Sequence, residues 1–324
     1  MPLSRRNLLK TLPPTLALST MPGFAGETQP FSISLAQWSL HRSFFGASWG
    51  ADFRKAFAAD PDSVLRGEHD PLNFPVLARQ AFGIDAVEYV NTFFFSRARD
   101  TGYLAELKSR AAGEGVRSLL IMCDALGSTG DADEAARQQA IDNHRPWLEA
   151  AAFLGCRAIR VNAAGLGTAE EVARRVADSL HQLGNLAEPL SLDVLVENHG
   201  GISSNGAWLA GTIEQADHPR VGTLPDFGNF RISGQGEQAV VYDRYQGVTE
   251  LMPHARAVSA KSYDFDPAGN ETSIDFARML DIVLGAGYRG YIGIEYEGSR
   301  LSEFDGIRAT RDLLIRLRQN HSSA

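Results

Sequence analysis

The sequence is poor in cysteine and carries an excess of acidic charge. Its 324 residues include two cysteines, Cys123 and Cys156, and each lies within an apolar stretch. Two thiols cannot form a disulfide framework, and the apolar surroundings favour buried, unreactive side chains. The formal net charge of −8 repels phosphate backbones, so a nucleic-acid partner is disfavoured.

Two further features are missing. No segment of the sequence is long and apolar enough for a transmembrane helix, so we expect no membrane span in the mature chain. No glycine-rich phosphate loop follows the first predicted strand, where the residues are Ala36, Gln37, Trp38 and Ser39. A doubly wound nucleotide-binding sheet requires such a loop, so this fold is disfavoured. We find no internal repeat and no low-complexity linker.

The N-terminal residues resemble a twin-arginine export signal. Arg5 and Arg6 precede the apolar run 11–21, and the small-x-small pattern 23–25 suits signal peptidase. A short amphipathic start to the folded domain is the alternative, which Pro13 and Pro14 disfavour. We therefore predict a signal over residues 1–25, one domain over 26–324 and a periplasmic location.

The remaining sequence alternates between short β-branched runs and longer helical patterns. Eight strands are predicted: 31–37, 84–90, 116–123, 158–162, 192–198, 221–226, 257–262 and 291–295. The clearest helical patterns cover 103–113, 134–154, 169–183, 274–285 and 303–318. Strands that alternate with helices in this number predict an α/β fold, the single-domain (β/α)8 TIM barrel, for which this chain length is normal.

A long irregular insertion, residues 44–73, follows the first predicted strand. It contains several aromatic residues, among them Phe44, Phe45, Trp49 and Phe57. In a barrel this segment lies at the catalytic face, so it is either a lid or a segment that packs its aromatics on the barrel rim.

Polar side chains end nearly every predicted strand. Residues at these positions of a barrel face the substrate. They are Gln37, His41, Glu88, Arg160, Asn162, Glu197, Asp226, Asn229, Lys261, Glu295 and Glu297. Several buried carboxylates in one place are costly unless a cation neutralises them. The pattern therefore predicts a divalent metal held by carboxylates of different strands, beside a polar ligand.

Four sequence blocks make the comparison with known proteins specific. In the order VENHGG, PDFGNF, SAKSYDF and GYIGIEYEG, they resemble the xylose-isomerase-like sugar phosphate isomerase/epimerase superfamily. The resemblance implies a metal held by Glu197, Asp226 and Glu295, with the two glutamates doubling as an acid/base pair. The sequence departs from the family pattern at Ser259 and Asn229, where histidines are usual. His199 is our candidate for a compensating ligand.

The residue types suggest a mechanism. A carboxylate can remove a carbon-bound proton next to a carbonyl if the resulting enediolate is stabilised by a metal or an ammonium group. We expect Glu197, Glu295 and Lys261 to be catalytic, with Lys261 acting as a cation rather than as a ligand. The expected substrate-binding residues are Gln37, His41, Glu88, Arg160, Asn162, Asn229 and Glu297. Trp38 and the run 93–95 are candidates for stacking on a sugar ring.

The expected function is a metal-dependent isomerase or epimerase of an unphosphorylated sugar or keto-sugar, with Mn²⁺, Mg²⁺, Co²⁺ or Zn²⁺ as the cofactor. Export and the lack of a phosphate cradle both argue against a phosphorylated substrate. A 3-keto-glycoside lyase or hydratase is the alternative within the same chemistry, and a non-catalytic sugar-binding barrel is the alternative outside it. An abasic-site endonuclease is disfavoured by the acidic charge and the missing histidines. The partner is a small carbohydrate, and a homo-oligomer is compatible with this interpretation.

Overall fold

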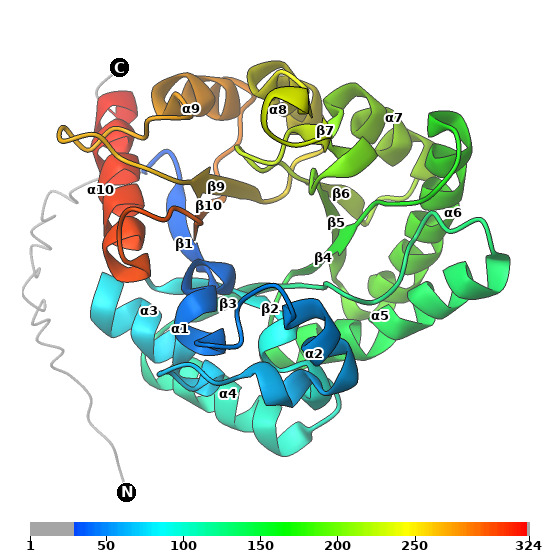
Figure 1. Cartoon of the computed structure of the whole chain (residues 1–324), viewed down its shortest axis with the longest axis horizontal. Coiled ribbons are helices and arrows are strands. Elements are labelled where there is room, and N and C mark those ends of the chain that lie inside the picture. Colours follow the sequence, from blue (N-terminus) through cyan, green and yellow to red (C-terminus); the bar gives the residue numbers. More distant parts are fainter. Residues whose placement is uncertain (1–28, 323–324) are drawn as a thin grey trace, which may run out of the picture.

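The computed structural model describes residues 29–322. Eight parallel strands form a central ring, with helices packed around its outside (Figure 1). The strands are β1 (Ser32–Ala36), β2 (Ala86–Val90), β3 (Arg117–Met122), β4 (Ala158–Asn162), β5 (Asp193–Glu197), β6 (Val221–Leu224), β9 (Val258–Ser262) and β10 (Tyr291–Tyr296). Their hydrogen-bonded order, β6-β5-β4-β3-β2-β1-β10-β9, leaves β6 and β9 at the two ends of the sheet.

The two end strands meet through isolated contacts rather than a continuous ladder. Parallel bridges pair Thr223 with Ala255 and Asp226 with Ser259. The backbone N–H of Ser259 donates to the carbonyl of Pro225 at 2.9 Å, and Phe227 N–H donates to the Ser259 carbonyl at 3.1 Å. The eight-stranded barrel therefore closes at the place where β6 ends and β9 begins.

A helical segment follows each strand. The helices are α1 (His41–Phe45), α2 (Phe53–Ala59), α3 (Phe74–Phe82), α4 (Thr101–Gly113), α5 (Glu134–Leu154), α6 (Ala169–Ala187), α7 (Gly206–Ala216), α8 (Arg244–Leu251), α9 (Phe276–Gly285) and α10 (Glu303–Ser322). Three of them (α1, α2 and α3) follow β1. A small antiparallel hairpin, β7 (Arg231–Ser233) and β8 (Val240–Val241), lies between β6 and α8.

The hydrophobic core lies between the strands and the surrounding helices. In β10, Ile292, Ile294 and Tyr296 are fully buried, and Glu295 alternates with them. Since successive strand residues point to opposite faces, apolar side chains pack against the helices while Glu295 faces the barrel interior. The alternation explains how a strand of largely apolar sequence delivers a carboxylate to the centre of the molecule.

The predicted fold, a single-domain α/β barrel, is confirmed, and all eight predicted strands are present. Strand β6 is shorter than predicted, because Pro225 has no N–H to continue the ladder, so Asp226 lies just beyond the strand. The predicted export signal, residues 1–25, lies outside the described part of the chain.

The insertion after β1 packs most of its aromatic side chains inward. Phe44, Phe45 and Phe57 are buried, whereas Trp49 is 40% exposed. Of the two interpretations of this segment, a lid or packing on the barrel rim, rim packing is correct for the buried rings. Within the described residues, no helix is both long and apolar enough to span a bilayer.

Candidate functional site

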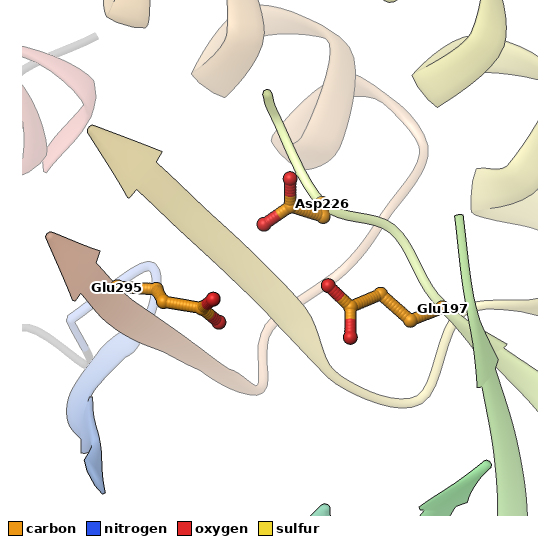
Figure 2. A group of neighbouring side chains, drawn as sticks. All are labelled: Glu197, Asp226 and Glu295. Carbon is orange, nitrogen blue, oxygen red and sulfur yellow. The ribbon is translucent and has the colours of Figure 1, made fainter. Parts of the chain in front are cut away.

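Three carboxylates from three neighbouring parts of the barrel converge on one point. Glu197 ends β5, Asp226 follows β6, and Glu295 lies in β10. One oxygen from each lies within 4.8 Å of the others, and all three side chains are buried. Figure 2 shows their carboxyl groups pointing into a shared space in front of β9. The sequence prediction that these three residues meet is therefore correct in its geometry.

Asp226 is held firmly by its neighbours. Its Oδ1 accepts the backbone N–H groups of Gly228 and Asn229, both at 2.8 Å, and its Oδ2 accepts the Ser259 hydroxyl at 2.6 Å. The same hydroxyl lies 3.3 Å from Glu295 Oε2. Ser259 thus bridges two members of the carboxylate group from the position where the family resemblance leads one to expect a histidine.

Glu197 is held by one amide and one guanidinium. Asn229 Nδ2 donates to Glu197 Oε1 at 3.0 Å, and Arg160 Nε lies 2.8 Å from Oε2 as an ion pair without hydrogen-bond alignment. Within residues 29–322, Glu197 Oε2 has no hydrogen-bond partner. This buried oxygen is ion-paired with Arg160 but accepts no aligned hydrogen bond from these residues.

Lys261 supplies a second cation. Its Nζ lies 2.8 Å from Glu295 Oε1 and 3.3 Å from Glu297 Oε2, and its side chain is 2% exposed. Burial lowers the pKa of Lys261, but the facing carboxylates of Glu295 and Glu297 outweigh that effect and hold the pKa well above its usual value. Lys261 is therefore an ammonium ion and a hydrogen-bond donor.

Burial of the carboxylates disfavours their ionised forms and raises their pKa values. Burial raises the pKa of Glu197 to about 7, against the opposing effect of Arg160. Burial also raises the pKa of Asp226 to about 7, against the effect of Lys261. A carboxyl group that is half protonated near neutrality becomes fully ionised when a cation is bound beside it.

The site fits a divalent cation. Three buried carboxylates within reach of one another, one with an oxygen that accepts no hydrogen bond from the described part of the chain, offer the hard oxygen ligands that such ions prefer. Glu197, Asp226 and Glu295 would hold the ion, and the Ser259 hydroxyl lies beside two of them.

His199 does not join this group. Its side chain is exposed, and its backbone N–H donates to Ser203 Oγ at 3.0 Å. The predicted same-face position assumed that β5 continues past Glu197, but the strand ends there and Gly200 takes a φ of 86°. The loop, rather than strand alternation, carries the imidazole, which stays within electrostatic reach of Asp124, Lys261 and Glu295 without joining the carboxylate group.

The predicted substrate-binding residues separate into two kinds. Asn229 and Glu297 lie beside the carboxylate group, as the contacts above show. Gln37 and His41 are buried, and their side chains are hydrogen-bonded to the protein backbone. Gln37 Oε1 accepts the Val90 N–H at 3.0 Å, and His41 Nδ1 donates to the Trp38 carbonyl at 2.9 Å.

Arg160, Asn162 and Glu88 also make internal contacts. Arg160 Nη1 lies 2.6 Å from Asp124 Oδ1, and Asn162 Nδ2 donates to the same oxygen at 2.8 Å. Burial raises the pKa of Asp124, but Arg160 outweighs this and holds the pKa at about 2. Glu88 accepts the Ser34 hydroxyl at 2.6 Å inside the barrel. Arg160 therefore positions Glu197 through an ion-pair network instead of facing solvent.

The aromatic run 93–95 was expected to stack on a sugar. Phe93 and Phe94 are instead buried in the core, at 0% and 2% exposure. Trp38 is partly buried and does reach the site, since its Nε1 donates to Glu297 Oε1.

Sequence reasoning missed one residue that organises the site. Asn198 is fully buried, its Oδ1 accepts the Asp226 N–H at 2.8 Å, and its Nδ2 donates to the Asp226 and Asn229 carbonyls. It joins the ends of β5 and β6. Its place directly after Glu197 was the available signal, because an outward-facing polar residue at a strand end needs a local partner.

Together these features define a (β/α)8 barrel with a buried carboxylate cluster and a lysine at the carboxyl ends of its strands, the usual place for a barrel active site. The chain belongs to the xylose isomerase-like TIM barrel family, whose profile matches residues 76–319.

Solved structures with the same fold include sugar epimerases. The E. coli 3-keto-D-glucoside 4-epimerase is 20% identical with a TM-score of 0.59, covering 78% of this chain and 95% of that one. An L-ribulose 3-epimerase is 15% identical with a TM-score of 0.64, covering 90% and 95%. A xylose isomerase-like barrel from Mycobacterium smegmatis in complex with magnesium is 15% identical with a TM-score of 0.62, covering 90% and 97%.

One curated protein matches over a short stretch. The C-glycoside deglycosidase alpha subunit of Arthrobacter globiformis is 39% identical over 54 residues, which make up 17% of this chain and 15% of that protein.

Proposed function

We propose that the protein is a metal-dependent isomerase or epimerase that removes a proton next to the carbonyl of an unphosphorylated sugar or keto-sugar. The convergence of Glu197, Asp226 and Glu295 beside Lys261 carries this proposal. The epimerases of the same fold support it, as does the magnesium complex. Residues 1–25 as an export signal and a periplasmic location belong to the same proposal.

Each residue of the site has its own role in this reaction. Glu197 or Glu295 takes the carbon-bound proton, and the other glutamate returns a proton to the same or the neighbouring carbon. The Lys261 ammonium donates a hydrogen bond to the carbonyl oxygen as negative charge develops there. A pKa near 7 suits Glu197 to exchange protons at neutral pH. A divalent cation at the three carboxylates would supply Lewis-acid stabilisation of the same oxygen.

Deuterium wash-in tests the proposal. The protein is loaded with Mn²⁺ or Mg²⁺ and incubated in deuterated water with a panel of free sugars and 3-keto-sugars. We expect one substrate carbon to gain deuterium, and we expect Glu197→Gln to lower the rate by at least about a hundredfold, the usual contribution of a general base.

Glu149→Gln is the matched control, because Glu149 is exposed on α5 and the same chemical change there leaves the site intact. Retention of every carbon-bound proton would identify a sugar-binding barrel instead. Undiminished exchange in Glu197→Gln would remove this residue from the mechanism.

A 3-keto-glycoside lyase is the second candidate, and the short match to a C-glycoside deglycosidase subunit favours it. The same proton abstraction would then be followed by departure of the group at the sugar's anomeric carbon. Product analysis separates the two reactions, since a lyase releases a free aglycone and an epimerase releases none.

A further inference from the structure

An aromatic surface lies beside the proposed site. We call Trp38, Phe45, Trp49 and Phe53 the aromatic shelf. Trp49 stacks on Phe45 with ring centroids 5.8 Å apart and an interplanar angle of 14°, and it meets Trp38 and Phe53 edge-on at 5.4 and 4.8 Å. Phe45 is buried beneath it, while Trp49 is 40% exposed. The shelf therefore has a buried base and an indole that remains open to solvent.

Side-chain contacts connect the shelf to the carboxylates. Trp38 Nε1 donates to Glu297 Oε1, and the other oxygen of Glu297 lies 3.3 Å from Lys261 Nζ. Lys261 in turn pairs with Glu295. The strands agree with this arrangement, since β1, which precedes the shelf, is hydrogen-bonded to β10. The Glu297 side chain is 30% exposed, so the shelf borders the solvent-facing side of the site.

The core does not account for the exposed indole. Phe45 already fills the space next to Phe93, with ring centroids 4.7 Å apart, and is itself fully buried. Trp49 adds a large apolar face outside that packing. A free sugar held by the carboxylates and Lys261 needs polar partners, whereas an apolar ring attached to the sugar needs a surface of this kind.

We infer that the protein takes glycosides, with the sugar ring at the carboxylates and an aromatic aglycone stacked on Trp49, whose indole meets Trp38 edge-on. This inference rests on the proposed function for the position of the sugar. Aromatic contacts of this type strengthen binding by about two- to tenfold. The shelf thus selects substrates by the group attached to the sugar.

Calorimetric binding measures this selection directly. The Mg²⁺-loaded protein is titrated with the 3-keto forms of phenyl and methyl β-D-glucoside. We expect the phenyl glucoside to bind more tightly, and Trp49→Ala to weaken its binding about two- to tenfold while leaving the methyl glucoside unchanged. Trp49→Phe should keep most of the preference and shows that any loss in Trp49→Ala is not misfolding.

Phe153→Ala is the matched control, since Phe153 is also 40% exposed but lies on α5. It should change neither affinity. Equal binding of the two glucosides, no binding of either, or equal weakening of both in Trp49→Ala would overturn the inference. Phenyl preference without deuterium exchange would refute the proposed reaction and keep the shelf. Deuterium exchange without phenyl preference would refute the role of the shelf and leave the proposed reaction in place.

Discussion

Glu88 places a carboxyl group inside the barrel with a single hydrogen-bond donor. Ser34 donates to its Oε1, and among the described residues its Oε2 has no hydrogen-bond partner. Burial raises the pKa of Glu88 from 4.5 to about 7 despite the Ser34 hydrogen bond. Between pH 4.5 and 7 the folded state therefore binds more protons at this group than the unfolded chain does, so the stability falls as the pH rises through this range.

We expect Glu88→Gln to stabilise the protein at pH 8 and to change little at pH 5. The shift of roughly 2.5 pH units corresponds to a gain of about 3 kcal/mol at the higher pH, because the amide is neutral and can still accept the Ser34 hydrogen bond. Chemical denaturation at both pH values measures the effect. A variant that is less stable than the wild type at pH 8 would show that Glu88 is paired in its ionised form.

Residue roles were harder to predict than residue positions. The carboxylates could be placed because each follows an apolar strand run, and strand ends meet in a barrel. Arg160 could not be told apart from a substrate-binding residue, because its partners Asp124 and Glu197 come from different strands. The orientation of His199 depends on a loop whose course no periodicity encodes.

At the level of elements, α10 fixes the start of α1. The Glu303 carboxylate accepts the Arg42 N–H at 2.7 Å, the Ser43 N–H at 2.9 Å and the Ser43 hydroxyl at 2.5 Å. These amides belong to the first turn of α1, whose free N–H groups need acceptors. Glu303 therefore holds the segment that carries Trp38 to the site.

We expect Glu303→Ala to lower the free energy of unfolding by about 1–3 kcal/mol, since it leaves partly buried donors unpaired. It should also change tryptophan fluorescence, because Trp38 and Trp49 pack on this segment. Glu106→Ala is the control, as its exposed pair with Arg110 is worth less than about 1 kcal/mol. If the two variants were equally stable, Glu303 would not hold α1 in solution.

The elements themselves were predictable to different degrees. The long helix α5 is clear from its apolar periodicity despite Pro146 within it. Residue ranges were not predicted for helices α3, α7 and α8, and the β7–β8 hairpin was not predicted. Helices α3 and α8 are short, and α7 carries Gly211 and Thr212, residues of low helix propensity, in its interior, so packing against the barrel stabilises these helices more than a strong local pattern does.

On the scale of the whole molecule, the barrel closes next to its carboxylates. The bridge between Asp226 and Ser259 joins the two end strands of the sheet, and the same two side chains are hydrogen-bonded in the site. A cation held by Glu197, Asp226 and Glu295 would tie β5, β6 and β10 together across this junction. Metal binding and barrel stability should therefore be coupled.

The pH dependence of this coupling has a definite sign. Burial raises the pKa of Glu197 and Asp226 to about 7, from 4.5 and 3.8. Between these values the metal-free fold binds more protons than the unfolded chain, so its stability falls as pH rises. A divalent cation binds the ionised carboxylates, so its contribution grows over the same range.

We therefore expect the melting temperature in the presence of a chelator to be lower at pH 8 than at pH 5.5, and Mn²⁺ or Mg²⁺ to raise it most at pH 8. At a hundredfold excess over Kd the gain is about 2.7 kcal/mol, a shift of several degrees. Asp226→Asn should abolish the metal-induced rise, while Glu149→Gln should retain it. Identical melting curves with and without metal at pH 8 would show that the carboxylate cluster does not bind the metal. The cluster would then act through Lys261 and its own protons, since Lys261 is the cation that the chain itself holds against Glu295.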